Sequence, residues 1–264
     1  MGGANEAMGG ASEAAGGASE ARGKLYVVGF GPGNAENMTE ACRSRLQEAD
    51  IVVGYSGYVK LLRPLYPDKM FLETGMTRET ERCRKAVQLA EQGRTVCIIS
   101  GGDSGVYGMA ALVLELAGED PGFDVEVIPG VTAALSGAAL LGAPLGHDFA
   151  VISLSDLLTP WETIEKRLRA AASGDFAICL YNAGSKKRAG HLRAACEILL
   201  ESIPGNRLCG IARNIGREGE SISLMALAEL HEIQADMTDT VFIGNASTRK
   251  IGGRMITPRG YRDA

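Results

Sequence analysis

The sequence lacks a C-x-x-C pair, an apolar run of membrane length and a block of basic residues. A membrane-spanning helix needs about 20 apolar residues in a row, so no membrane is expected as a partner. Lysine and arginine number 27 against 32 acidic residues, which gives a net charge of -5 at pH 7. Without a basic face that could follow a phosphate backbone, no nucleic acid is expected as a partner either.

The six cysteines fall inside apolar or helical patterns rather than at metal-ligand spacing. We interpret them as small core residues in a reducing compartment, and therefore predict a cytoplasmic location. An iron–sulfur or zinc site is not expected, and no metal ligands are assigned. The six cysteines are Cys42, Cys83, Cys97, Cys179, Cys196 and Cys209.

The first segment, residues 1–23, repeats a short glycine- and alanine-rich unit that begins at Gly2, Gly9 and Gly16. Such residues cannot bury enough surface to offset the entropy of ordering, so the segment is predicted to be a disordered tail. It also lacks the basic and apolar regions of a signal peptide.

From Lys24 onward, apolar runs alternate with amphipathic ones, a pattern typical of parallel α/β layers. It predicts two consecutive α/β domains, residues 24–143 and 144–264, with a cofactor cleft between them. Expected strands are 25–29, 51–54, 70–73, 95–100 and 125–128 in the first domain and 150–155, 176–181, 208–213, 221–225 and 240–244 in the second. Expected helices in the first domain are 39–49, 58–65, 77–92, 107–117 and 132–141.

Two boundary signals are specific enough to test. Gly93 is expected at the C′ position that ends helix 77–92. Thr159 is expected to be the N-cap of a helix, with Pro160 at its first position and Glu162 completing a capping box.

Two glycine-rich loops follow predicted strands, where open α/β sheets bind ligands. In residues 101–105 three glycines let the backbone approach a ligand closely, and Asp103 offers an acceptor. In residues 29–33 the glycine spacing is G-x-G-x-G, which is not the dinucleotide-binding spacing, and no P-loop motif is present. A classical NAD or P-loop site is therefore not expected.

Five segments stand out, in this order: Val28 to Gly33, Gly101 to Gly108, Ile128 to Ala133, Tyr181-Asn182 and Ala212 to Glu220. Together they resemble the tetrapyrrole methylase family over residues 24–248, essentially the whole predicted ordered chain. Members of that family methylate corrinoid or porphyrinoid precursors with S-adenosylmethionine. Residues 74–77, 105–110, 142–161 and 185–188 resemble most closely the branch that acts at C17 of precorrin-3B in cobalamin biosynthesis, with ring contraction to precorrin-4.

The resemblance implies two α/β domains, a homodimer, and a cofactor folded in the cleft that leaves as S-adenosylhomocysteine. The implied cofactor contacts are Gly101, Asp103, Val106, Thr132, Ala133, Leu180, Tyr181, Ala212 and Thr240.

The implied substrate is a large tetrapyrrole with many carboxylates, which an acidic protein can hold only with local positive charge. Ring contraction also needs proton movement, for which His147 beside Asp148 is the candidate catalytic pair; a structural hydrogen bond is the alternative role for His147. Candidate substrate-binding residues are Lys186, Lys187, Arg188, Arg213 and Arg217, with Arg78 and Arg82 as further candidates.

Four alternatives stay open at this point. The macrocycle could arrive metal-free, or with cobalt already bound as in the anaerobic route. The enzyme could act at another position of the corrin ring. A non-catalytic tetrapyrrole carrier would keep the basic cleft and lose cofactor affinity, and a nucleic-acid methyltransferase is disfavoured by the net charge.

Overall fold

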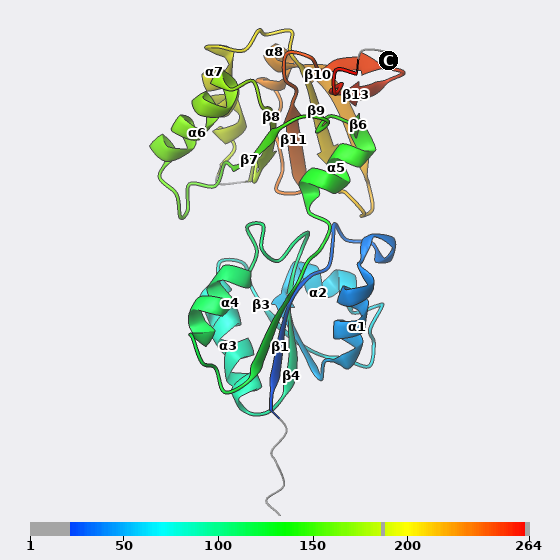
Figure 1. Cartoon of the computed structure of the whole chain (residues 1–264), viewed down its shortest axis with the longest axis vertical. Coiled ribbons are helices and arrows are strands. Elements are labelled where there is room, and N and C mark those ends of the chain that lie inside the picture. Colours follow the sequence, from blue (N-terminus) through cyan, green and yellow to red (C-terminus); the bar gives the residue numbers. More distant parts are fainter. Residues whose placement is uncertain (1–21, 186–187, 262–264) are drawn as a thin grey trace, which may run out of the picture.

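The computed structural model describes residues 22–185 and 188–261, which form two sheet-based units one after the other along the long axis (Figure 1). The predicted disordered tail lies outside the described residues except for Arg22 and Gly23, and so do the substrate-binding candidates Lys186 and Lys187.

The first unit is a five-stranded, fully parallel sheet in the order β3-β2-β4-β1-β5. Apolar β1 and β4 lie in the middle, as buried parallel strands should. The strands are β1 (Lys24–Gly29), β2 (Ile51–Tyr55), β3 (Met70–Thr74), β4 (Thr95–Ser100) and β5 (Asp124–Ile128).

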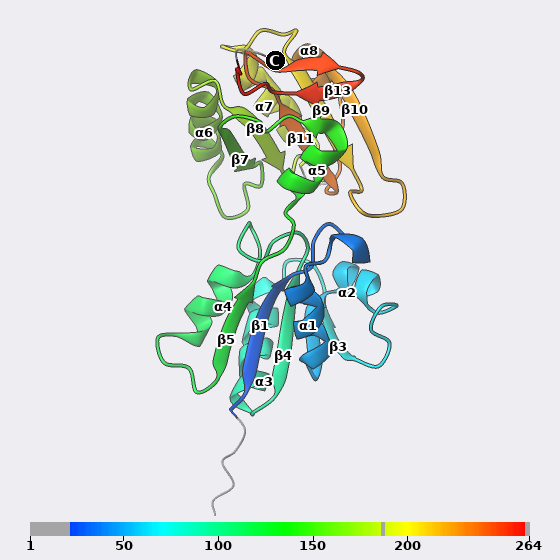
Figure 2. The ribbon, with the colours of Figure 1, turned by 45° about the vertical axis from the view of Figure 1, so that its right-hand side comes forward.

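Helices cover both faces of this sheet (Figure 1). The apolar faces of α1 (Glu40–Glu48) and α2 (Ser56–Leu62) pack on one side, and those of α3 (Glu79–Glu91) and α4 (Ala110–Ala117) on the other. A short 3-10 helix, Ala35–Asn37, follows β1. Since all five strands run the same way, their carboxyl ends share one edge, and Figure 2 shows that this edge faces the second unit.

The second unit is a mixed sheet in the order β10-β9-β11-β8-β7, in which only β7 and β8 are parallel. The prediction of parallel layers throughout the chain is therefore wrong in this half. A short loop of residues 214–220 joins β9 to β10, and so short a connection can join only antiparallel neighbours. The strands are β7 (Phe149–Ser153), β8 (Ala177–Tyr181), β9 (Leu208–Arg213), β10 (Ser221–Ala226) and β11 (Asp239–Ile243).

One face of the second sheet packs on α6 (Trp161–Ser173), α7 (His191–Leu200) and α8 (Leu227–Leu230). The other face packs on α5 (Ala133–Leu141), whose Ala134, Ala138 and Leu141 are buried beside Phe242. Helix α5 precedes the domain boundary expected at residue 143, yet it packs with the second unit.

A small third sheet in the order β12-β13-β6 extends the second unit and has no counterpart in the sequence-based expectations. Its strands are β6 (Gly142–Ala143), β12 (Arg249–Ile251) and β13 (Arg254–Ile256). Gly252 and Gly253 both have positive φ, as a two-residue hairpin turn between twisted strands requires.

Two expected helix starts are wrong. Pro160 has an extended backbone, so α6 begins at Trp161; Pro160 is the N-cap and no side chain caps it. The Thr159 capping box is therefore absent. Helix α4 begins at Ala110 rather than Tyr107, because Tyr107 has φ 53 and cannot continue a right-handed helix. Gly93, with φ 80, follows the C-cap of α3 as expected.

All six cysteines are buried and free. Burial raises the pKa of Cys42 to about 12 and that of Cys83 to about 11, so these thiols stay protonated near neutral pH. Among the described residues, no helix is long and apolar enough to cross a bilayer.

Candidate functional site

A cavity of about 570 Å³ lies where the carboxyl edge of the first sheet meets the second unit. Loops that follow all five strands of the first sheet line it, together with segments next to β7, β8, β9 and β11. Both the volume and the position are typical of ligand sites in α/β proteins.

Eight of the predicted site residues line this cavity, and they come from both units. Leu180 and Ala212 do not line it and are fully buried on opposite faces of the second sheet. Side chains alternate along a strand, so Leu180 packs on the helices while Tyr181, next to it, turns toward the cavity. The eight are Gly101, Val106, Thr132, Ala133, Tyr181, Arg188, Thr240 and Arg217.

Glycines let three backbone segments meet at the cavity wall. Gly31 and Gly102 exchange backbone hydrogen bonds of 3.0 and 2.7 Å, which joins the loops after β1 and β4. A Cβ on Gly130 would lie 2.5 Å from the carbonyl oxygen of Gly29 and closer still to that of Gly102. A Cβ on Gly101 would lie 2.9 Å from the ring of Tyr58. The wall therefore requires glycine at these positions.

Asp103 lies behind this wall and does not line the cavity. Its Oδ1 accepts a hydrogen bond from the Gly105 N–H at 2.8 Å, and its Oδ2 accepts one from the Gly130 N–H at 2.9 Å. The carboxylate thus connects the loop after β4 to the loop after β5.

We expect Asp103→Ala to lower both stability and cofactor affinity, because two backbone N–H groups lose a charged acceptor. The cost is about 2 kcal/mol, or roughly 4–8 °C in Tm for a chain of this size. Calorimetry of unfolding and titration with S-adenosylhomocysteine measure the two effects. Asp120→Ala, at an exposed position, is the control; equal values for the three proteins would refute a connecting role for Asp103.

Tyr181 links the second sheet to the start of α5. Its hydroxyl accepts a hydrogen bond from the Ala134 N–H at 2.6 Å and lies 2.5 Å from Thr132 Oγ1. Burial raises the pKa of Tyr181 to about 12, so the phenol remains neutral. The two predicted cofactor residues Thr132 and Ala133 are therefore held against β8.

Backbone strain is concentrated around the cavity. Among the described residues, five that are not glycine have positive φ, and four of these line it: Thr77, Tyr107, Asn182 and Asn214. Such conformations cost of order 1–3 kcal/mol each and tend to persist where function requires them.

Two contacts bridge the units across the cavity. The Tyr107 hydroxyl donates to the Val151 carbonyl at 3.1 Å and accepts from the Ser153 N–H at 3.2 Å, both on the edge strand β7. Arg217 Nε, from the loop after β9, donates to the Pro32 carbonyl at 3.0 Å. The loops that line the cavity thus hold both units together.

We expect Tyr107→Phe to weaken S-adenosylhomocysteine binding about fivefold with little change in Tm, since about 1 kcal/mol of hydrogen bonding between the units is lost. Isothermal titration measures the affinity. Tyr261→Phe, at a position that is 74% exposed, is the control; equal affinities in both variants would show that the bridge does not shape the cavity.

The remaining predicted residues lie elsewhere. Arg213 does not line the cavity and forms an ion pair of 3.1 Å with Asp239, whose carboxyl pKa is raised by burial. His147 and Asp148 are exposed, follow the short strand β6 and do not line the cavity.

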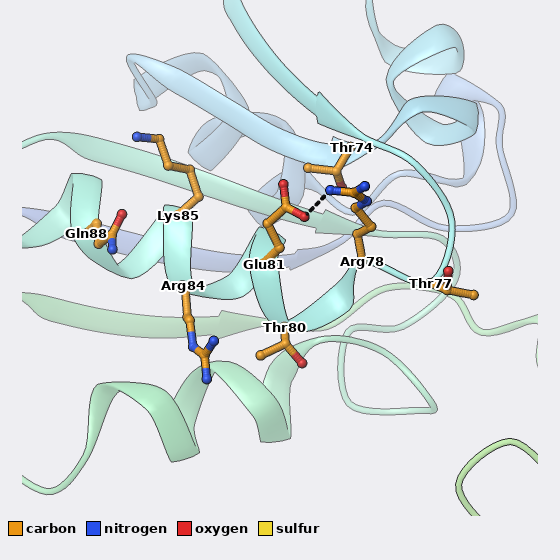
Figure 3. A pocket seen from close by; sticks show the side chains of 8 residues that line it. All are labelled: Thr74, Thr77, Arg78, Thr80, Glu81, Arg84, Lys85 and Gln88. Atoms are coloured by element: carbon orange, nitrogen blue, oxygen red, sulfur yellow. Dashed lines mark hydrogen bonds and ion pairs between the residues drawn. The ribbon is translucent and has the colours of Figure 1, made fainter.

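A second depression, about 650 Å³, lies along α3 outside the cleft (Figure 3). Its cations do not converge on one point: Arg78 pairs with Glu81 at 2.7 Å, and Arg84 and Lys85 point in opposite directions (Figure 3). It therefore offers no built anion site.

Sequence reasoning did not assign the first-unit wall formed by Tyr55, Tyr58 and Met76. One signal was available: β2 and β3 were predicted, and the residues after parallel strands share the ligand edge. Arg82, which also lines this wall, was among the further basic candidates but had no geometric support.

The fold and site define a class: a two-unit α/β protein with a glycine-lined ligand cavity between a parallel and a mixed sheet. The family model of tetrapyrrole (corrin/porphyrin) methylases matches residues 24–231. The chain belongs to this family and is a methyltransferase.

The names of individual relatives agree with this family assignment. The chain is 49% identical over 239 residues to the probable cobalt-factor III C(17)-methyltransferase of Salmonella typhimurium, covering 90% of this chain and 99% of that protein. It is 42% identical over 251 residues to the precorrin-3B C(17)-methyltransferase of Sinorhizobium sp, covering 92% and 98%. The crystal structure of the methyltransferase CobJ superposes with a TM-score of 0.83 at 40% identity, covering 89% and 100%.

Proposed function

We propose that this protein transfers a methyl group from S-adenosylmethionine to C17 of precorrin-3B, or of its cobalt-bearing counterpart, with ring contraction, in cobalamin biosynthesis. The observation that carries the proposal is the glycine-lined cavity between the units, in a chain whose relatives with 49% and 42% identity are both named C17-methyltransferases.

The cavity suits S-adenosylmethionine, because its volume of about 570 Å³ is in the range of small-molecule sites and Gly101 and Gly102 bring the backbone itself to its wall. When bound, that molecule supplies an electrophilic methyl group on a sulfonium. Gly101, Val106, Thr132, Ala133, Tyr181 and Thr240 would contact it directly. Asp103 would act by holding the loops, and Leu180 and Ala212 by packing behind the wall.

The main tasks of the protein residues are alignment and exclusion of water. A methyl transfer needs the nucleophilic carbon in line with the sulfur–methyl bond, and positioning of that kind supplies several powers of ten in rate. The cavity lies between two units bridged by Tyr107 and Arg217, which suits a bisubstrate reaction shielded from solvent.

Substrate contacts are proposed for Arg188 and Arg217, which line the cavity. The Nε of Arg188 is buried and has no hydrogen-bond partner within residues 22–185 and 188–261. Arg213 would act through Asp239. Lys186 and Lys187 lie outside the described residues and remain candidates from the sequence. The catalytic role of His147 and Asp148 in ring contraction remains a prediction. Variants at these residues that lose ring contraction but keep methyl transfer would support it.

An assay with both precursors shows whether the protein methylates a metal-free or a cobalt-bearing substrate. The relative with 49% identity is named for cobalt-factor III and the relative with 42% identity for precorrin-3B, so both precursors are offered with labelled cofactor. Mass spectrometry should show one added methyl group with one of them. No transfer to either, despite S-adenosylhomocysteine binding, would point to another corrin precursor. Loss of cofactor binding as well would favour a tetrapyrrole carrier.

Two finer proposals accompany this function. We expect a homodimer, which sedimentation or light scattering measures directly, and a cytoplasmic location, which fractionation tests.

A further inference from the structure

Arg82 is the most buried cation on the cavity wall. It is 4% exposed and comes from α3, directly beyond the end of β3. Its Nε donates to Thr74 Oγ1 at 2.8 Å, its Nη2 donates to the Gly75 carbonyl at 3.0 Å, and its Nη1 lies 3.9 Å from Met109 Sδ. All three partners are neutral.

No carboxylate of the described residues lies within ion-pair distance of Arg82, although Glu79 also lines the cavity. Burying a guanidinium without a counter-charge is costly. Three of its five N–H groups are occupied by the neutral partners, so two remain for a ligand. A buried cation of this kind attracts an anion strongly, because the surroundings screen charge poorly.

A second cation lines the cavity from the other unit. Arg217 uses only its Nε, on the Pro32 carbonyl, and among the described residues it has no ion pair. Arg82, Arg217 and Tyr58 all line the cavity. Burial raises the pKa of Tyr58, and the charges of the two guanidinium groups oppose this rise.

The ring of Tyr58 is packed against its neighbours on the cavity wall. Its ring makes edge contacts with Phe30 at 5.4 Å and with Tyr55 at 5.3 Å between ring centroids, and it packs over Gly101. Two guanidinium groups and a phenol therefore line the same cavity.

We propose that Arg82, Arg217 and Tyr58 form a carboxylate-binding subsite that orients the macrocycle through one of its peripheral acid groups. This inference rests on the proposed function, which supplies a polycarboxylate substrate. Because Arg82 belongs to the first unit and Arg217 to the second, one carboxylate held by both would also join the units over the bound cofactor. The three residues are specificity-determining rather than catalytic.

The test compares Arg82→Met, Arg217→Met and the double variant, with Arg78→Met as control. Arg78 lies at the N-cap of the same helix, but it is exposed and pairs only with Glu81. In methyl transfer to whichever of the two precursors the parent methylates, each of the first two changes should raise KM about 10- to 100-fold, the range for loss of a charged hydrogen bond. The affinity for S-adenosylhomocysteine should stay within about twofold of the parent in Arg82→Met. Arg217→Met also loses the bridge to Pro32, so its affinity should fall about fivefold, as in Tyr107→Phe, which is less than the expected rise in KM.

The double variant tests whether both cations bind the same carboxylate. If they do, its KM rises by clearly less than the product of the two single effects. A purely structural role for Arg82 predicts a lower Tm and an unchanged KM, whereas release of an unpaired buried charge predicts a Tm equal to or above the parent value. Should Arg82→Met fail to fold, the KM of Arg217→Met still tests the subsite. Arg217 lies in a half-buried loop, so this variant is expected to fold.

Binding without turnover separates this inference from the function itself. Cobyrinic acid, a stable corrinoid polycarboxylate, should bind the parent at least tenfold more tightly than its fully methyl-esterified form, and this preference should shrink in both single variants. Equal binding of acid and ester by the parent, or no binding of either, would overturn the subsite. A parent that shows the preference but methylates neither precursor would contradict only the proposed function.

Discussion

Gly130→Ala should abolish measurable S-adenosylhomocysteine binding. The new methyl group would overlap the carbonyl oxygens of Gly29, at the end of β1, and of Gly102, in the loop after β4. Gly29 is held in the parallel sheet and Gly102 by its backbone hydrogen bonds to Gly31, so neither can move freely. The loop before α5, with Thr132 and Ala133, must therefore shift away from the cavity. We expect a loss of stability of about 3 kcal/mol or more, as for other overpacked positions.

Gly122→Ala is the matched control, because nothing lies within 4 Å of a Cβ built there and the residue belongs to the same unit. Isothermal titration and thermal unfolding of both variants separate loss of the site from loss of the fold. A Gly130→Ala protein that bound S-adenosylhomocysteine like the parent would show that the cofactor does not use this wall.

Tyr181→Phe should have the second largest effect. The change keeps the ring and removes the hydroxyl that accepts from the Ala134 N–H and contacts Thr132, so a partly buried backbone donor loses its partner. We expect stability to fall by about 2 kcal/mol and S-adenosylhomocysteine affinity to fall at least tenfold.

Tyr26→Phe is the control for this variant. It also loses one hydrogen bond, to Glu48 Oε1 at 2.7 Å, but on β1 far from the cavity. Its affinity for S-adenosylhomocysteine should equal that of the parent. If both variants lost affinity to the same extent, the effect would be general destabilisation rather than displacement of Thr132.

The first sheet could be predicted because each of its strands is a short apolar run, and each run is followed by a loop or helix signal. The run of residues 95–100 ends in three glycines within five residues, which marks the ligand edge directly. In the second sheet, strand positions were predicted within about two residues, but their directions were not. Direction depends on which strands become neighbours, and an apolar pattern is the same for a strand running either way.

The third sheet was missed because its strands are two or three residues long, too short for a period of two to be visible. The helix start at Pro160 was misplaced because a Thr-Pro sequence fits an N-cap followed by the first helical position, and only the extended backbone of Pro160 moves the start on by one residue.

At the site, the sequence predicted which charged groups are present better than it predicted which atoms those groups contact. A loop carboxylate at Asp103 was expected to face the cofactor, but both of its oxygens accept backbone hydrogen bonds. Arg213 was a candidate for substrate binding because of its charge, which Asp239 balances from a neighbouring strand. Gly130 is distant in sequence from Asp103, and Asp239 is distant from Arg213, so neither of these contacts leaves a local signal.

The position of the transferred methyl group tests the central claim most directly. The protein is incubated with S-adenosylmethionine carrying a ¹³C-methyl group and with cobalt-factor III or precorrin-3B, and the product is examined by ¹³C NMR. Our account predicts a single labelled methyl group on C17 of a contracted ring. A label on any other ring carbon, or an unlabelled macrocycle recovered beside intact cofactor, would contradict it.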